Sequence, residues 1–209
     1  MTNPNYTHLA MVVDRSGSMK GIHTDMNGAI LELIETQASL GGELRIDITT
    51  FDDTVEFPYV NAKAEDITGD IITPRGMTAL NDAVGRSIQT LGVRLAKMSE
   101  EERPGKVIFV IITDGLENMS REYTHDAVKT LVEEQTDKWG WEFLYLAANV
   151  DAFATGAQHG YGQGQTISFA ANNIGTSNVV NAANEYVTRS RSGLSTEFTD
   201  EERIAASGQ

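Results

Sequence analysis

A continuous apolar run at residues 9–13, Leu-Ala-Met-Val-Val, is the feature that most restricts the fold of this chain. Both faces of such a run must be covered, which is typical of a parallel strand buried within an α/β sheet. The polar sequence Asp14-Arg15-Ser16-Gly17-Ser18 follows without a gap. Open α/β sheets bind ligands at the carboxyl ends of their strands, so the sequence predicts a site here, with Asp14 at the surface.

Strand and helix patterns alternate along the rest of the chain. Apolar residues recur at helical spacing in residues 21–40 and 80–98, and again in two later helices, the first of them capped by Ser120. Residues 156–165, rich in Gly and Gln, are expected to form a loop, and Thr199-Asp200-Glu201-Glu202 has the capping-box pattern of a short terminal helix. Further strands are predicted at residues 44–51, 55–60, 107–112, 141–147 and 166–169.

This order of elements predicts an α/β fold with a doubly wound, mostly parallel sheet. Pro58 cannot donate a ladder hydrogen bond, so the strand that contains it is expected at an edge, in an antiparallel pair with residues 44–51. We expect one domain over residues 1–209, with a core at about 8–190 and a C-terminal extension at about 191–209.

Two later segments carry side chains of the same chemistry as the first polar sequence. Thr78 lies in a glycine-bearing loop just before a predicted helix, and Asp114 follows the buried strand at residues 107–112. The carboxyl ends of parallel strands share one sheet edge, so we expect both residues to lie near Asp14, Ser16 and Ser18. Carboxylate and hydroxyl oxygens suit a hard cation such as Mg²⁺.

In this order, Asp14-x-Ser16-x-Ser18, Thr78 and Asp114 resemble the metal-ion-dependent adhesion site (MIDAS) of von Willebrand factor A-type (vWA) domains. The resemblance covers residues 8 to about 190 and extends to small stand-alone vWA proteins of bacteria and phages. It implies a Rossmann-like vWA fold. It also implies that Ser16 and Ser18 bind Mg²⁺ directly, that Thr78 binds directly or through water, and that Asp14 and Asp114 act mostly through coordinated waters. Mn²⁺ or Ca²⁺ could take the same place.

The function implied by this resemblance is a metal-dependent protein-binding module. Neutral hydroxyl ligands leave the cation most of its charge, so an Asp or Glu of a partner protein can complete the coordination. Asp82 and the pair Asn149 and Asp151 are further candidates near the site, with a solvated or capping role favoured for Asp82. Candidates for the surrounding rim are Met19, Lys20, His23, Arg75, Met77, Glu117 and Asn118.

Two other functions remain open. An accessory or regulatory subunit of an ATPase or stress-response complex would use the same site with a different partner. A metal-dependent phosphoester-processing enzyme is disfavoured, because Ser16 stands where a second acid is needed and no phosphate-binding loop or activated nucleophile is evident. We therefore expect no enzymatic activity.

Composition excludes several other classes. The chain has no cysteine, so it has neither disulfides nor thiolate zinc sites. Its formal net charge of −14 argues against binding to nucleic acid. Residues 1–6 lack the features of a secretory signal and no apolar run has bilayer length, so we expect a cytoplasmic protein that does not bind membranes. Trp139 and Trp141 are expected in the core. Three histidines are expected to be structural or at the surface: His8, His125 and His159.

Overall fold

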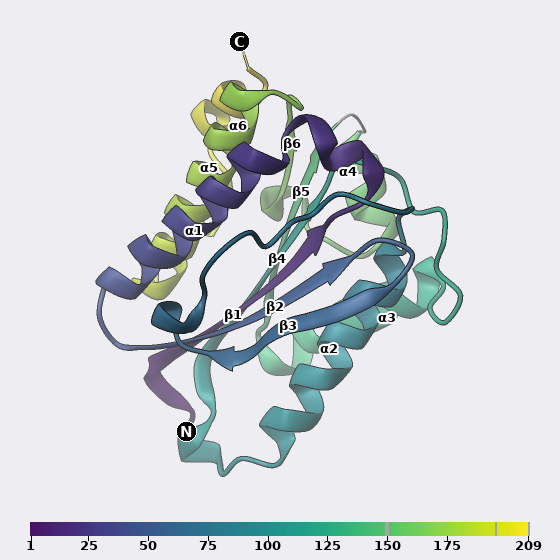
Figure 1. Ribbon diagram of the computed structural model, residues 1–209. Helices are drawn as coiled ribbons and strands as arrows, with labels where there is room; N and C mark the ends of the chain where they lie inside the picture. The colour runs from purple at the N-terminus through teal and green to yellow at the C-terminus, as the bar shows by residue number, and fades with distance from the viewer. Residues whose placement is uncertain (149–150, 195, 209) are drawn as a thin grey trace.

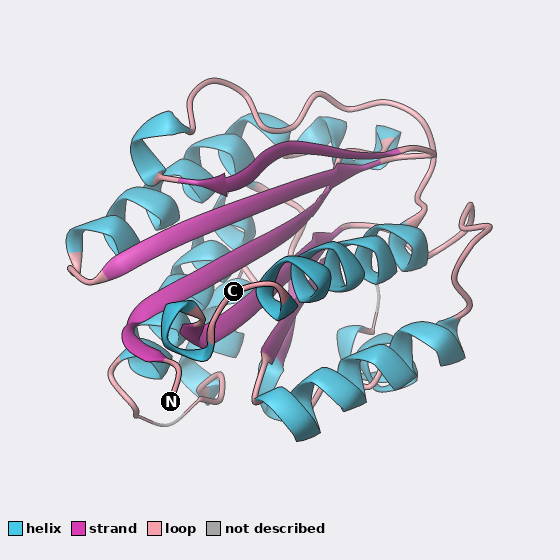
Figure 2. Ribbon diagram, turned by 90° about the horizontal axis from the view of Figure 1, so that it is seen from below, coloured by secondary structure: helices cyan, strands magenta, loops and turns pink. Residues whose placement is uncertain are grey.

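A six-stranded sheet between two layers of helices forms the body of the molecule (Figures 1 and 2). The computed structural model describes residues 1–148, 151–194 and 196–208. The strand order is β3-β2-β1-β4-β5-β6, and every neighbouring pair is parallel except β2 and β3. The predicted doubly wound sheet with one antiparallel edge is therefore confirmed. The strands are β1 (Asn3–Asp14), β2 (Glu43–Phe51), β3 (Val55–Ala62), β4 (Pro104–Thr113), β5 (Glu142–Ala148) and β6 (Thr166–Phe169).

Helices cover both faces of this sheet. The helices α1, α5 and α6 lie on one face, and α2 and α3 lie on the other (Figure 1). None of the helices in the described part of the chain is long and apolar enough to cross a membrane. The helices are α1 (His23–Ser39), α2 (Leu80–Ala96), α3 (His125–Trp139), α4 (Ala152–Gln158), α5 (Asn173–Arg191) and α6 (Asp200–Ala206).

The central strand β1 contains the apolar run at residues 9–13. Leu9, Met11 and Val13 point into the core beneath α1 and α5, whereas Ala10 and Val12 point into the core beneath α2 and α3. All five side chains are at most 3% exposed. Because the strand has no solvent face, its carboxyl end at Asp14 is fixed between two packed layers.

The last helix is anchored to this body. The predicted capping box is present, with Thr199 Oγ1 accepting from the Glu202 amide at 3.1 Å and Glu202 accepting from the Thr199 amide at 2.8 Å. Phe198 and Ala206 are buried in the same core as α1 and α5. Helix α6 therefore closes that side of the sheet over α5 and β6.

Two local predictions are wrong. Helix α3 begins after Thr124, whose hydroxyl accepts from the Ala127 amide at 3.2 Å, and Ser120 does not cap it. Residues 156–165 are not a continuous loop, because α4 occupies Ala152–Gln158 and a 3₁₀ turn occupies Gln163–Gln165. The Asp151 carboxylate accepts from the amides of Phe153 and Ala154, which is the local signal that starts α4.

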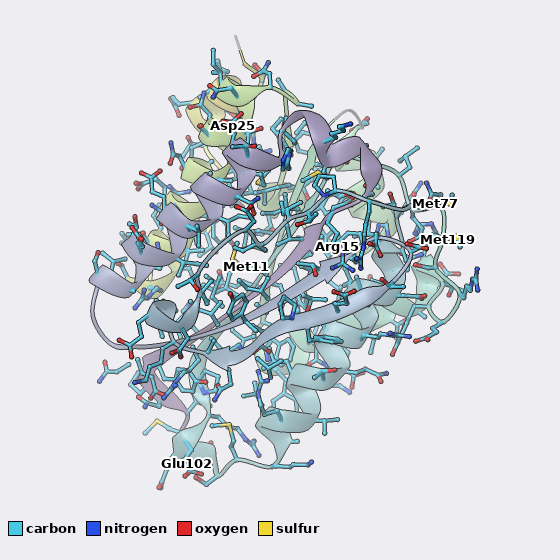
Figure 3. All side chains as sticks on the ribbon, in the orientation of Figure 1. Met11, Arg15, Asp25, Met77, Glu102 and Met119 are labelled. Carbon is cyan, nitrogen blue, oxygen red and sulfur yellow. The ribbon has the colours of Figure 1, made fainter. Side chains whose placement is uncertain are left out.

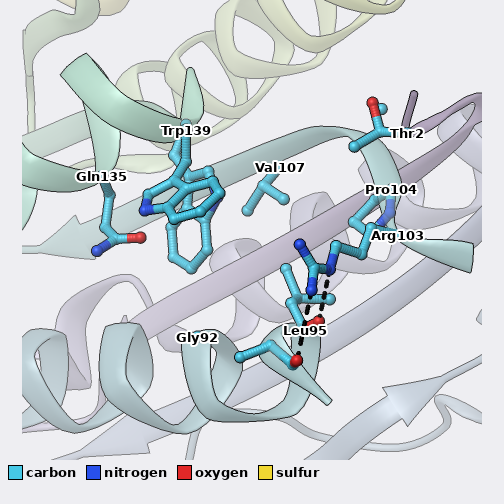
Figure 4. A pocket seen from close by; sticks show the side chains of 11 residues that line it. Thr2, Gly92, Leu95, Arg103, Pro104, Val107, Gln135 and Trp139 are labelled. Carbon is cyan, nitrogen blue, oxygen red and sulfur yellow. Dashed lines mark hydrogen bonds between the residues drawn. The ribbon is translucent and has the colours of Figure 1, made fainter. Parts of the chain in front are cut away.

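The two tryptophans differ in burial. Trp141 is 6% exposed and belongs to the core, as expected, whereas Trp139 is 62% exposed. Trp139 is the last residue of α3, and together with Trp141 it lines a pocket of about 300 Å³ near the amino ends of the strands (Figure 4). The expectation that Trp139 is a core residue is therefore wrong.

Candidate metal centre

The predicted oxygen ligands from β1 and β4 lie within hydrogen-bonding distance of one another. Asp14 ends β1, and Asp114 follows the neighbouring parallel strand β4. Ser18 Oγ donates to Asp114 Oδ1 at 2.6 Å, and Ser16 Oγ lies 2.9 Å from Ser18 Oγ. Ser16 and Ser18 lie at the start of the 3₁₀ turn Gly17–Gly21 and not at the first turn of α1. A chain of oxygen atoms therefore connects the ends of two strands.

Asp14 is completely buried, so the prediction that it lies at the surface is wrong. Its Oδ1 accepts from the Ser16 amide at 2.6 Å, and its Oδ2 accepts from Thr113 Oγ1 at 2.6 Å. Thr113 was not among the predicted site residues, although it is the residue next to Asp114 on the adjacent strand. These two bonds fix the orientation of the carboxylate relative to Ser16.

Thr78 joins the group from the loop before α2. Its side chain is buried, and its backbone is held at both ends by Asn118, with the Thr78 amide donating to Asn118 Oδ1 and the Asn118 amide donating to the Thr78 carbonyl, each at 3.0 Å. A Cβ atom at Gly115 would lie 3.5 Å from Thr78 Oγ1 and 3.7 Å from Ser18 Oγ. Both hydroxyls therefore flank the same point beside Gly115, and all five predicted ligands meet at one place.

The electrostatics of this place favour a cation. Burial raises the pKa of Asp14 to about 6, and the Asp114 charge adds to this, although the hydrogen bonds from Thr113 and Ser16 oppose it. Burial also raises the pKa of Asp114. Among the described residues, neither carboxylate forms an ion pair with a Lys or Arg. A bound divalent ion would supply the missing positive charge.

The donor set fits Mg²⁺ better than a softer metal. The described part of the chain brings no three His, Cys, Asp or Glu side chains together in a metal-binding group. A metal here would therefore depend on the Ser16, Ser18 and Thr78 hydroxyls as well as the two carboxylates. Such an all-oxygen set, with few charges, is the environment in which Mg²⁺ keeps several waters.

Arg15 points away from this oxygen group and forms an ion-pair network on the side of β2 and β3. Its Nε donates to the buried Asp52 at 3.1 Å, and Arg75 Nε donates to the same Asp52 oxygen at 2.6 Å. Glu56 accepts from both arginines at 2.7 Å. Burial alone would raise the pKa of Asp52, but the hydrogen bonds from Arg75 and Thr54 and the charge of Arg15 hold it well below its usual range.

This network joins the two loops that carry the hydroxyl ligands. The Arg75 amide donates to the Arg15 carbonyl at 2.8 Å, and the Ala79 amide donates to the Asp52 carbonyl at 2.7 Å. Gly76, at a φ of 66°, has no room for a side chain, because a Cβ atom would lie 2.4 Å from Asp53 Oδ1. Asp52 thus links the loop after β1 to the loop that carries Thr78.

A second carboxylate holds the segment at residues 117–123. Asp82 accepts from the backbone amides of Arg121, Glu122 and Tyr123, each at 2.9 Å. The Tyr123 ring lies against Gly85 of α2, where a Cβ atom would approach it to 2.5 Å. Asp82 is 7% exposed, and these amides precede Thr124, the residue that caps α3, so the favoured solvated or capping role is wrong. Asp82 instead fixes the segment that contains the Asn118 contact to Thr78.

Replacing Asp82 with alanine is expected to lower the free energy of unfolding by about 2 kcal/mol, because hydrogen bonds to a charged acceptor are lost. It should also weaken Mg²⁺ binding, since the support of Thr78 loosens. Hydrogen exchange should show faster exchange of the three amides at residues 121–123. The exposed Asp137 provides the control, and equal exchange in Asp82→Ala and Asp137→Ala would show that the segment is held by other contacts.

The rim candidates fall into three groups. Met19 is fully buried in the core, so its predicted place on the rim is wrong. Lys20 and Met77 are exposed and His23 is half-buried; Met77 lies on a loop beside the one that carries Met119 (Figure 3). Arg75, Glu117 and Asn118 lie beside the site, but their side chains are hydrogen-bonded to neighbouring segments.

Glu117 supports the start of α2. Its carboxylate accepts from the Asn81, Met119 and Ser120 amides at 2.7–2.8 Å and from the Ser120 hydroxyl. This explains why Ser120 does not cap α3. Of the two weaker candidates after β5, Asp151 caps α4, and Asn149 lies outside the described residues.

Comparison with solved structures identifies the architecture. The vWF domain of the type V pili tip protein Mfa5 from Porphyromonas gingivalis superposes with a TM-score of 0.66 at 10% identity, covering 93% of this chain and 98% of that one. The chain has a vWA-like fold. The PilB minor pilin from Streptococcus sanguinis superposes with a TM-score of 0.61 at 11% identity, covering 88% of this chain and 61% of that one.

A third structure shows a metal in a related setting. Proximal thread matrix protein 1 from the mussel byssus, with a zinc-occupied MIDAS motif, superposes with a TM-score of 0.61 at 12% identity. The match covers 87% of this chain but only 46% of the mussel chain. No protein-family model matches the sequence, and no curated protein matches it. The likeness to vWA proteins therefore rests on the fold.

Proposed function

We propose that this protein is a metal-dependent protein-binding module whose Mg²⁺ site comprises Asp14, Ser16, Ser18, Thr78 and Asp114. The observation that carries the proposal is the convergence of two buried carboxylates and three hydroxyls at one sheet edge, with no cationic side chain paired to either acid among the described residues. The vWA-like fold and the zinc-occupied MIDAS of a structural neighbour support it.

The surroundings of the site favour a protein partner that presents an Asp or Glu. Ser18 is exposed, so one side of the oxygen group faces solvent. The neighbouring loops expose Met77 at 48% and Leu116 at 59%, which gives apolar surface beside the metal position. A partner carboxylate could complete the coordination of the metal while apolar groups beside it contact these two side chains.

Replacing Thr78 with alanine is expected to weaken Mg²⁺ binding by about tenfold, because one hydroxyl is lost from the site without any change in charge. Titration calorimetry on the purified chain measures this directly. The exposed Thr73, in the same connecting segment, gives a matched control. Equal affinities in Thr78→Ala and Thr73→Ala would place the metal away from this loop.

The partner is tested by affinity capture from the native host, in Mg²⁺ and again in EDTA. We expect a captured protein to be released by EDTA, and a change of its contacting acid to the amide to abolish binding. A complex that survives both EDTA and the amide substitution would show that the metal is structural and that another face binds the partner.

We further propose that the site binds and does not catalyse. Among the described residues, the hydrogen bonds of the Ser16 and Ser18 hydroxyls run to each other and to Asp114, and neither hydroxyl contacts a histidine that could act as a general base. Turnover of a phosphoester such as p-nitrophenyl phosphate in Mg²⁺ that disappears in Ser16→Ala would contradict this.

A further inference from the structure

A second pocket lies beside the start of β5, where β6 is too short to cover this strand. Strand β6 pairs only with Tyr145–Ala148, so residues 142–144 at the start of β5 have a strand partner on the β4 side alone. Beside this uncovered edge lies a pocket of about 370 Å³. The residues that line it include Trp141, Glu142, Phe143, Tyr161, Gln165 and Tyr186.

Two buried polar groups of this pocket lack partners. Glu142 Oε1 accepts from Lys106 Nζ at 2.9 Å and from Ser190 Oγ at 2.7 Å, whereas Glu142 Oε2 is buried without a hydrogen-bond partner among the described residues. The Tyr186 hydroxyl is likewise without a partner there, and Tyr186 is 0% exposed. A buried oxygen without a partner is costly, so each atom would be stabilised by a donor or acceptor of a ligand that reaches it from the pocket.

Aromatic side chains form part of the pocket wall. The Phe143 and Tyr161 rings are stacked with centroids 6.3 Å apart, and Trp141 lies 6.5 Å from Phe143. Such a wall accommodates a flat ring, and its faces also attract a positive charge. Burial, aided by the Glu142 charge, raises the pKa of Tyr186, although the nearby Thr196 and Gln165 side chains oppose this, so its hydroxyl keeps its proton at neutral pH.

We propose that this pocket binds a small aromatic amine in its protonated form. The ammonium group donates to Glu142 Oε2 and contacts the Tyr186 hydroxyl, while the ring packs against Trp141, Phe143 and Tyr161. Lys106 is bound to the other Glu142 oxygen and is 33% exposed, so solvent screens its repulsion. The net charge of −14 favours the approach of a cation over that of an anion.

The test compares 2-phenylethylamine with 2-phenylethanol, which share a skeleton and differ only in the charged donor. Binding to the full chain is followed by the indole N–H resonance of Trp141, which is assigned with Trp139→Phe. The amine should bind saturably, and the alcohol at least about tenfold more weakly. Absence of saturable amine binding at about 10 mM, or equal binding of both probes, would overturn the proposal.

Two variants separate this site from general effects on folding. Glu142→Gln removes the charge at nearly constant shape, and Tyr186→Phe removes a hydroxyl that has no protein partner among the described residues, so it should not lower Tm. Each should weaken amine binding at least several-fold while leaving the response to Mg²⁺ unchanged. Tyr59→Phe is the control, since its hydroxyl lies elsewhere and donates to the Thr68 carbonyl. Amine binding that is the same in all three variants would overturn the proposal.

Discussion

Replacing Asp52 with alanine is expected to lower the free energy of unfolding by about 3–5 kcal/mol, the cost of breaking a buried ion pair from one side. Asp52 is 0% exposed and accepts from both Arg15 and Arg75. Among the described residues, its removal leaves the exposed Glu56 as the one charged partner of the buried Arg15 guanidinium. Denaturant unfolding followed by circular dichroism measures the loss.

The same variant should also weaken Mg²⁺ binding, because Asp52 links the loop after β1 to the loop that carries Thr78. The adjacent Asp53 is exposed and forms no ion pair in the described part of the chain, so Asp53→Ala is a matched control with little expected effect on stability. If both variants lose the same stability, the turn conformation matters and the ion-pair network does not.

Replacing Asp14 with asparagine should have opposite effects on stability and on metal binding. In the metal-free protein, the rise in the pKa of Asp14 from 3.8 to about 6 corresponds to about 3 kcal/mol of destabilisation at neutral pH. Asparagine removes this cost and can still hydrogen-bond to Ser16 and Thr113. Thermal unfolding in EDTA should therefore show a higher Tm for Asp14→Asn, and added Mg²⁺ should no longer raise it.

The pH dependence follows from the sign of the same shift. A carboxyl whose folded-state pKa lies above its unfolded value stabilises the fold when protonated, so metal-free protein should lose this contribution as the pH rises from about 4 to about 6. Mg²⁺ competes with the proton, so metal affinity should fall as the pH drops below about 6. The control is Asp70→Asn, at an exposed aspartate, which should leave the pH profile of the wild type unchanged. A wild-type pH profile in EDTA that Asp14→Asn does not alter would contradict this account.

Much of the fold could be predicted because its signals are local. The apolar runs of β1 and β4, the Pro58 edge and the Thr199 capping box each depend on neighbouring residues, and the structure has each of these features. The start of α3 was mispredicted because a distant carboxylate intervenes. Asp82 binds the amides at residues 121–123, and Glu117 binds the Ser120 hydroxyl, so the helix begins only after Thr124.

The residues of the candidate site could be proposed from the sequence, whereas the contacts that support them could not. The motif residues could be identified from their spacing, but the supports of Asp14 and Thr78 come from residues far apart in the chain, such as Thr113 and Asn118. Arg15 lies inside the motif, yet its partner Asp52 follows β2. Met19 follows the motif directly, but the 3₁₀ turn directs its side chain into the core. Such long-range contacts cannot be inferred from local patterns.

The central position of β1 has a consequence for the order of events during synthesis. Ser18 and Asp114 meet across 96 positions of sequence, so a growing chain lacks Asp114, one of the five proposed ligands, until β4 has emerged and paired with β1. We expect the contact between Ser18 and Asp114, which are far apart in sequence, to form after the folding nucleus. Bound cation should therefore slow unfolding far more than it speeds folding, and the loaded protein would be long-lived once made.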